Sequence, residues 1–175
     1  MKTLLITLLI TLSATTMEST FYSFKVAMLD SDQKIDFSSF KGKKVLVVNV
    51  ASKCGFTPQY EELQALSERY KESLVVIGMP CDQFAGQELD LESSIKQFCT
   101  EQFHVTFPMT TIIDVKGDNQ HPVYQWLTQK SQNGLGDYSV KWNFNKFLIS
   151  EEGQLLAYFP STIKPLSEEI TKFLD

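Results

Sequence analysis

The chain has 175 residues, a length typical of one globular domain. Hydrophobic residues make up 43% and charged residues 21%, which excludes a disordered or collagen-like chain. The net charge is −5, without basic runs, so we expect no binding to nucleic acid. Two histidines and three widely spaced cysteines exclude a CxxC motif and a dense disulfide scaffold. We therefore expect no metal and no tightly bound organic cofactor.

The first sixteen residues differ in kind from the rest of the chain. Lys2 is followed by an apolar run and then by small residues up to Thr16, as in a secretory signal peptide. The run is roughly half as long as a membrane span requires, and no later stretch is long enough. We expect 1–16 to be a signal peptide, 17–175 to be one soluble domain, and the protein to be periplasmic or secreted. If Met17 is the true start, the protein is cytoplasmic instead.

The first half of the domain alternates between two hydrophobic patterns. The β-branched run Val45–Ala51 predicts a strand that is buried on both faces. A Thr-Pro helix start and helically spaced apolar residues predict an amphipathic helix over 57–71. Leu74–Met79 is a second apolar strand, and residues 91–102 form a second helix. The shared face of that helix is predicted to hold Leu91, Ile95, Phe98 and Gln102.

The second half continues with shorter elements. Residues 110–115 predict a third strand, and residues 123–130 predict a short helix. Residues 146–150 and 154–159 flank a Glu-Glu-Gly turn and predict a hairpin, and 165–174 predict a closing helix. The order indicates a single α/β unit in which the first two strands are parallel.

The functional site of an open α/β sheet lies beyond the carboxyl ends of its parallel strands. Cys54 follows the first strand and precedes a helix N-terminus, where unpaired N–H groups, the helix dipole and Lys53 favour a thiolate. The alternative is an inert buried cysteine. For Cys81, which follows the second strand, and for Cys99, in the second helix, a structural role is the default interpretation. His104 and His121 are expected to be structural too.

Three segments together resemble the glutathione peroxidase family. They are Val48-Asn-Val-Ala-Ser-Lys-Cys-Gly-Phe-Thr57, Gly78-Met-Pro-Cys-Asp-Gln-Phe-Ala-Gly-Gln-Glu88 and Lys141-Trp-Asn-Phe-Asn-Lys-Phe147. The resemblance runs in family order from about Phe24 to the C-terminus. It implies a thioredoxin-like α/β fold, with a mixed central sheet flanked by helices, and a peroxidase that reduces hydrogen peroxide and organic hydroperoxides.

The resemblance also assigns the site residues. Its nucleophile falls on Cys54, and its glutamine, tryptophan and asparagine fall on Gln87, Trp142 and Asn143. Amide and indole N–H groups can orient the peroxide and stabilise the leaving oxygen. The cysteine branch of the family commonly uses thioredoxin through a resolving cysteine, and the segment Ile-Lys-Gln-Phe-Cys places it at Cys99.

The chain departs from the family pattern at several positions. Asp82 stands where the family usually has asparagine, and a carboxylate there could disfavour the thiolate unless it is paired. Leu89 stands where proline is frequent, which we expect to be tolerated. The connection between His121 and Trp142 is short, which favours a monomer with an open site. Arg69 is the single arginine, so no arginine cluster is available to hold glutathione carboxylates.

These observations favour a thiol peroxidase that acts through a sulfenic acid and a Cys54–Cys99 disulfide, recycled by thioredoxin or glutathione, in the response to oxidative stress. A non-enzymatic peroxide sensor that relays oxidation to a partner protein is the main alternative. A thiol–disulfide oxidoreductase would normally carry a CxxC pair, and an α/β binding module would leave Cys54 inert.

Overall fold

The structure is a computed structural model that describes residues 20–175. The predicted signal peptide, residues 1–16, lies outside the described residues. The elements are, in chain order, η1 (Phe21–Ser23), β1 (Lys25–Ala27), β2 (Lys34–Asp36), η2 (Phe37–Phe40), β3 (Lys44–Val50), α1 (Gln59–Arg69), β4 (Leu74–Pro80), α2 (Glu92–Phe103), α3 (Pro122–Thr128), α4 (Lys130–Asn133), β5 (Lys146–Ile149), β6 (Leu155–Phe159) and α5 (Glu168–Thr171).

The central sheet is mixed and has the strand order β4-β3-β5-β6. β3 lies parallel to β4 along seven residue pairs, from Lys44 paired with Leu74 to Val50 paired with Pro80, and it lies antiparallel to β5. β5 and β6 form the predicted antiparallel hairpin. The parallel pairing of the first two long strands is confirmed, and it brings the segments that follow β3 and β4 to the same edge of the sheet.

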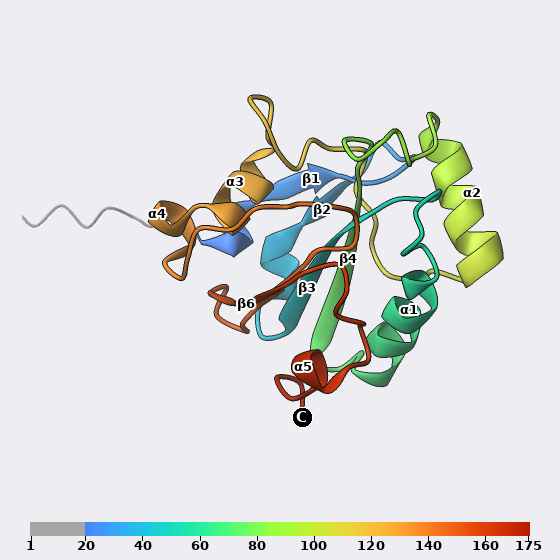
Figure 1. The fold of residues 1–175 in the computed structure, drawn as a ribbon. Helices are drawn as coiled ribbons and strands as arrows, with labels where there is room; N and C mark the ends of the chain where they lie inside the picture. The colour runs from blue at the N-terminus through green and yellow to red at the C-terminus, as the bar shows by residue number, and fades with distance from the viewer. Residues whose placement is uncertain (1–19) are drawn as a thin grey trace, which may run out of the picture.

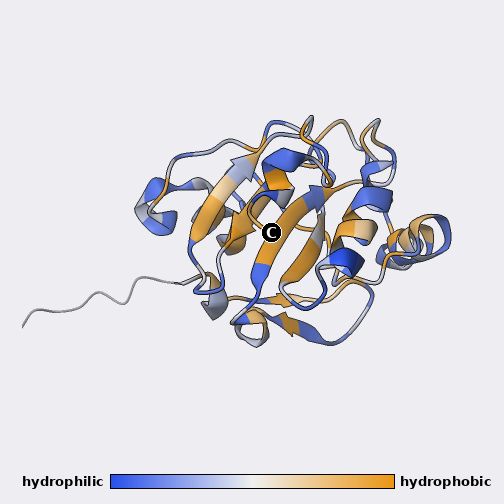
Figure 2. Ribbon diagram, turned by 90° about the horizontal axis from the view of Figure 1, so that it is seen from below, coloured by the Kyte–Doolittle hydropathy of each residue, from blue (hydrophilic) through white to orange (hydrophobic). Residues whose placement is uncertain are grey.

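Both faces of this sheet are covered by apolar side chains. Figure 2 shows that the central strands consist largely of hydrophobic residues. Successive side chains of a strand point to opposite faces, so Val45 and Val47 pack on the α3 side, with Tyr124. Leu46 and Val48 instead pack on the α1 and α2 side. Figure 1 shows these helices on opposite sides of the strands. The predicted α/β fold with helices flanking a mixed sheet is therefore confirmed.

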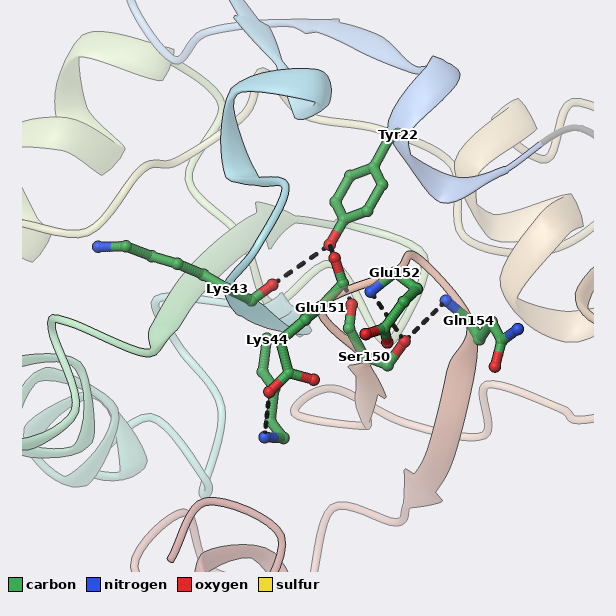
Figure 3. Close-up of polar contacts among 7 residues, drawn as sticks. All are labelled: Tyr22, Lys43, Lys44, Ser150, Glu151, Glu152 and Gln154. Atoms are coloured by element: carbon green, nitrogen blue, oxygen red, sulfur yellow. Dashed lines mark hydrogen bonds and ion pairs between the residues drawn. The ribbon is translucent and has the colours of Figure 1, made fainter.

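The N-terminal segment is attached to the end of the sheet that lies away from the carboxyl ends of β3 and β4. The Tyr22 hydroxyl lies 3.2, 3.0 and 2.8 Å from the backbone carbonyl oxygens of Lys43, Ser150 and Glu151 (Figure 3). Gly153, at φ +86°, leaves room for the tyrosine ring, because a Cβ there would lie 2.7 Å from it. The β1–β2 hairpin that follows was not predicted from the sequence.

Three predicted elements differ from the structure. Residues 110–115 are not a regular strand: Met109 makes a single bridge to Gly78 of β4, Thr110 makes one to Met28, just after β1, and the chain then continues without a ladder. The buried face of α2 consists of Ile95 and Cys99, whereas Leu91 is 65% exposed. The regular part of the closing helix is confined to α5, with turns on either side. Within residues 20–175 no helix is long and apolar enough to cross a membrane.

Candidate active site

Cys54 lies in the loop between β3 and α1, at the carboxyl end of the central strand. It is 6% exposed, and its Sγ atom accepts a hydrogen bond from the backbone N–H of Phe56 at 3.4 Å. Thr57 fixes this loop, since its hydroxyl accepts from the Cys54 N–H at 3.0 Å and donates to the Ala51 carbonyl at 2.8 Å. The prediction that Thr57 starts the helix is wrong: α1 begins at Gln59, and Thr57 shapes the cysteine loop instead.

Gln87 and Asn143 are brought together by the fold. Asn143 is fully buried, and its side-chain Nδ2 donates to Gln87 Oε1 at 3.1 Å. The Gln87 carbonyl in turn accepts from the backbone N–H of Lys53 at 2.8 Å, so the loop after β4 lies against the cysteine loop. Gln87 thus contacts both the cysteine loop, through its backbone carbonyl, and the turn that carries Asn143, through its side chain.

Asn49 and Lys146, which the sequence analysis did not single out, stabilise the turn that carries Trp142 and Asn143. Phe144 has the uncommon φ of +63°, and its N–H donates to the Asn49 carbonyl at 2.6 Å. The Asn49 side chain donates to the Trp142 carbonyl at 3.0 Å. Lys146 is fully buried, and its Nζ donates to the Phe144 carbonyl at 2.8 Å. A lone amide within the apolar run of β3 was the available sequence signal for Asn49, whereas Lys146, at the start of β5, resembled an exposed strand end.

Trp142 lies at the surface of this group. Its side chain is 38% exposed, and its ring lies 5.8 Å from that of Phe84, between ring centroids. Phe84 belongs to the same loop as Gln87, so the aromatic contact joins the loop after β4 to the turn before β5. The indole therefore borders solvent and is not part of the hydrophobic core.

The unusual Asp82 is paired. Its Oδ1 accepts from the backbone N–H of Glu88 at 3.0 Å, and the residue is exposed. An asparagine oxygen could accept the same bond, so the replacement is compatible with the loop geometry. Leu89 also fits, because its N–H donates to Glu88 Oε1 at 2.9 Å, a bond that proline could not make.

All three cysteines are free and buried, but they lie in different layers. Cys54 and Cys99 share the hydrophobic layer on the α1 and α2 side, whereas Cys81 is in the layer on the α3 side. Burial raises the pKa of Cys99 to about 11, against the opposing effect of the neighbouring Tyr60 hydroxyl. Burial also raises the pKa of Cys81 to about 11. Both are therefore thiols at neutral pH.

The two histidines lie at helix ends. His121 Nδ1 accepts from the Val123 N–H at 3.3 Å and so caps α3, and burial lowers its pKa. His104 follows α2 in the left-handed conformation, at φ +52°. Within residues 20–175 no three His, Cys, Asp or Glu side chains are grouped so that they could hold a metal ion.

The fold and this arrangement define a class of protein: an α/β redox protein with a cysteine at the carboxyl end of its central strand. Comparison with known proteins supports this class and narrows it. The glutathione peroxidase family profile matches residues 21–128. The glutathione peroxidase-like peroxiredoxin HYR1 of Saccharomyces cerevisiae is 48% identical over 155 residues, which cover 86% of this chain and 95% of that protein.

Solved structures support the same family and fold. The crystal structure of Trgpx in its apo form matches with a TM-score of 0.68 at 40% identity, over 89% of this chain and 93% of that one. A thiol:disulfide interchange protein of the thioredoxin family from Chlorobium tepidum has a TM-score of 0.62 at 14% identity, over 86% and 92% of the chains, and shows the shared thioredoxin fold alone. The chain belongs to the glutathione peroxidase family, and it is a thiol peroxidase of the thioredoxin fold.

Proposed function

We propose that Cys54 is the peroxidatic cysteine and that Gln87, Trp142 and Asn143 assist it. The observation that carries this proposal is the position of the Cys54 thiol, which accepts a backbone N–H at the entrance to α1. The loop of Gln87 lies against the loop of Cys54, and Gln87 is paired with the buried Asn143. Backbone N–H groups at such a position stabilise a thiolate, the reactive form of cysteine.

In the first step the Cys54 thiolate attacks one peroxide oxygen. A sulfur–oxygen bond forms, the oxygen–oxygen bond breaks, and the leaving alkoxide or hydroxide takes up a proton. Cys54 becomes a sulfenic acid, and the hydroperoxide becomes an alcohol or water. The side-chain amides and the Trp142 indole do not titrate in the working pH range, so their part is to donate hydrogen bonds to the peroxide oxygens.

In the second step Cys99 attacks the Cys54 sulfenic acid. A disulfide forms, and the hydroxyl of the sulfenic acid leaves as water with the Cys99 proton. Cys99 faces the core from an intact helix, so this step requires α2 to unwind in part. Two features support it: within α2 only Ile95 and Cys99 are fully buried, and the helix begins at the exposed Leu91 without a side-chain cap. Phe98 and Phe103 pack against the same layer but are only partly buried, so opening α2 exposes little fully buried surface.

The reductant in this proposal is thioredoxin, with glutathione as the alternative. A dithiol reductase reopens the disulfide by thiol–disulfide exchange and leaves two thiols. Arg69, the single arginine, lies 5.0 Å from the Tyr70 ring at the end of α1, which supports thioredoxin over a glutathione site built from arginines. We propose a monomer that protects against oxidative stress outside the cytoplasm, where a local dithiol protein takes the place of cytosolic thioredoxin. If Met17 is the start, the protein and its thioredoxin are cytoplasmic. Fractionation of cells that produce the full chain tests the export.

The function is tested by NADPH consumption with hydrogen peroxide and cumene hydroperoxide, coupled in parallel to the thioredoxin and the glutathione systems. We expect turnover with thioredoxin, none in Cys54→Ser, and a single turnover without recycling in Cys99→Ser. Cys81→Ser is the matched control, because Cys81 is equally buried but lies in the other layer. Undiminished cycling of Cys99→Ser would contradict the resolving role. Oxidation of Cys54 without turnover in either system would favour the peroxide sensor.

A further inference from the structure

Glu88 is a buried carboxyl group next to the site, and no sequence pattern singled it out. It follows Gln87 directly and is 2% exposed. Its Oε1 accepts two backbone hydrogen bonds, one from Ser52 at 3.0 Å and one from Leu89 at 2.9 Å. Ser52 belongs to the loop that carries Cys54, and Leu89 belongs to the loop that carries Gln87. One oxygen atom of Glu88 therefore joins the two loops.

Further contacts fix the same junction from both sides. The Lys53 backbone N–H donates to the Gln87 carbonyl at 2.8 Å, and the Lys53 ammonium donates to the Glu88 carbonyl at 3.2 Å. The Glu88 N–H donates to Asp82 Oδ1 at 3.0 Å. Both polar groups of the Gln87–Glu88 peptide are thus hydrogen-bonded, and the Glu88 side chain makes the contact that reaches from this segment to Ser52.

We propose that Glu88 is a positioning residue, which holds the Cys54 loop and the Gln87 loop in the register that sets the amide pair of Gln87 and Asn143 beside the Cys54 thiol. This inference rests on the proposed role of Cys54. Glu88 acts through the backbone of Ser52 and does not need to touch the peroxide. A displacement of about 1 Å between reacting groups can cost a factor on the order of 10² in rate, so the register matters for catalysis.

The carboxyl group is also a reason to expect a pH dependence. Burial raises the pKa of Glu88 by more than the hydrogen bonds from Ser52 and Leu89 lower it, and the charge of Asp82 adds a smaller increase. Three other titratable or charged groups face it: Lys53 through its ammonium, and Tyr60 and Cys99 through their electrostatic interaction with the carboxylate. A carboxylate accepts stronger hydrogen bonds than a neutral carboxyl group. As the pH falls toward this raised pKa, the bonds to Ser52 and Leu89 weaken and the loops separate more easily.

The test measures the second-order rate constant for oxidation of Cys54 by hydrogen peroxide in pre-reduced full-length protein, in a single turnover. Glu88→Ala leaves both N–H groups without their acceptor, and we expect the rate constant to fall on the order of 10²-fold. Glu88→Gln keeps an oxygen at the same place, so we expect it to stay within about threefold of the wild type at pH 7. Its rate should also lack the part of the pH profile that titrates with Glu88.

A matched control separates this effect from a general loss of stability. Gln64→Ala removes another buried side-chain oxygen that accepts a backbone N–H, that of Thr106 at 2.9 Å, at a junction between α1 and the segment after α2. We expect it to lower the melting temperature and to leave the rate constant unchanged. The side-chain amide NMR signals of Asn143 give a second readout, which should shift in Glu88→Ala and stay in place in Gln64→Ala.

Each result decides for or against the inference. An undiminished rate in Glu88→Ala, with unmoved Asn143 signals, overturns it. A rate in Glu88→Gln as low as in Glu88→Ala also overturns it, because the charge and not the hydrogen-bond acceptor would then be required. If Glu88→Ala does not fold, a Glu88→Gln pH profile identical to that of the wild type overturns it. Failure of wild-type Cys54 to react with peroxide refutes the proposed function instead, and the Asn143 signals still decide the positioning.

Discussion

Replacement of Lys146 by methionine should remove a large part of the pH dependence of stability. The Lys146 ammonium is fully buried at the start of β5 and donates to the carbonyls of Phe144 and Ile163, both at 2.8 Å. Burial lowers its pKa from 10.5 to about 7, and the charge of Glu62 only partly opposes this shift. Between these two values the unfolded chain binds a proton that the folded protein has released.

The sign and the size of the effect follow from this difference. The free energy of unfolding rises with pH wherever the unfolded state binds more protons, by about 1.4 kcal/mol per pH unit for one full proton. From pH 7 to 8.5 the Lys146 contribution therefore amounts to about 1.5 kcal/mol. Above pH 9 the buried thiols of Cys81 and Cys99 act in the opposite direction, since their folded pKa values of about 11 exceed the value of 9.0 in the unfolded chain.

The assay is urea unfolding at pH 7.0, 7.5, 8.0 and 8.5 with a reductant, for the wild type and Lys146→Met. We expect the wild type to gain about 1.5 kcal/mol more than the variant across this range. At every pH the variant also leaves the buried Phe144 carbonyl without its donor, at a cost of about 1–3 kcal/mol, and removes the bond to the part-buried Ile163 carbonyl. Parallel curves for the two proteins would refute the reasoning, because they would show that Lys146 binds the same number of protons in both states.

Three further predictions concern the site and the core. Asn143→Ala removes the amide that fixes Gln87, and we expect single-turnover oxidation of the thiol to slow on the order of 10²-fold, with a normal rate contradicting the proposed role. Gly153→Ala should lower the free energy of unfolding by about 1–3 kcal/mol more than Gly117→Ala, because both glycines have positive φ but only Gly153 lies against the Tyr22 ring. Equal urea midpoints for the two variants would refute this. Gly78→Ala should cost about 1–3 kcal/mol in urea unfolding, since its Cβ would lie 2.6 Å from a methionine sulfur.

The long strands could be predicted from the sequence because local pattern and tertiary environment agree there. A run of β-branched residues forms a doubly buried strand, as β3 does with its partner β4. The hairpin of β1 and β2 was missed, because each strand has three residues, too few for an alternating pattern to be recognised. Residues 110–115 carry a strand-like pattern, yet only Thr110 among them makes a bridge, to Met28.

The site was predictable only in part, and for a different reason. The thiol at a strand end follows from sequence position, but the pairing of Gln87 with Asn143 joins residues far apart in the chain, and the family resemblance alone pointed to both. Burial of a charged side chain has no sequence signature of its own. Glu88 and Lys146 therefore resembled ordinary surface residues, and their roles became visible only through the backbone groups that they contact.

The position of β5 has a consequence for how the protein is made. One edge of β3 pairs with β4, which follows closely in the chain. The other edge of β3 pairs with β5, which is synthesised near the end of the chain, and is unpaired until then. Contacts between distant segments form late, because the long intervening loop must first be closed. During synthesis the chain thus presents Cys54 long before the turn with Asn143 exists. A ribosome-bound chain therefore carries an unprotected thiol and an open strand edge, so completion of the fold depends on a reducing environment or on a chaperone that covers this edge.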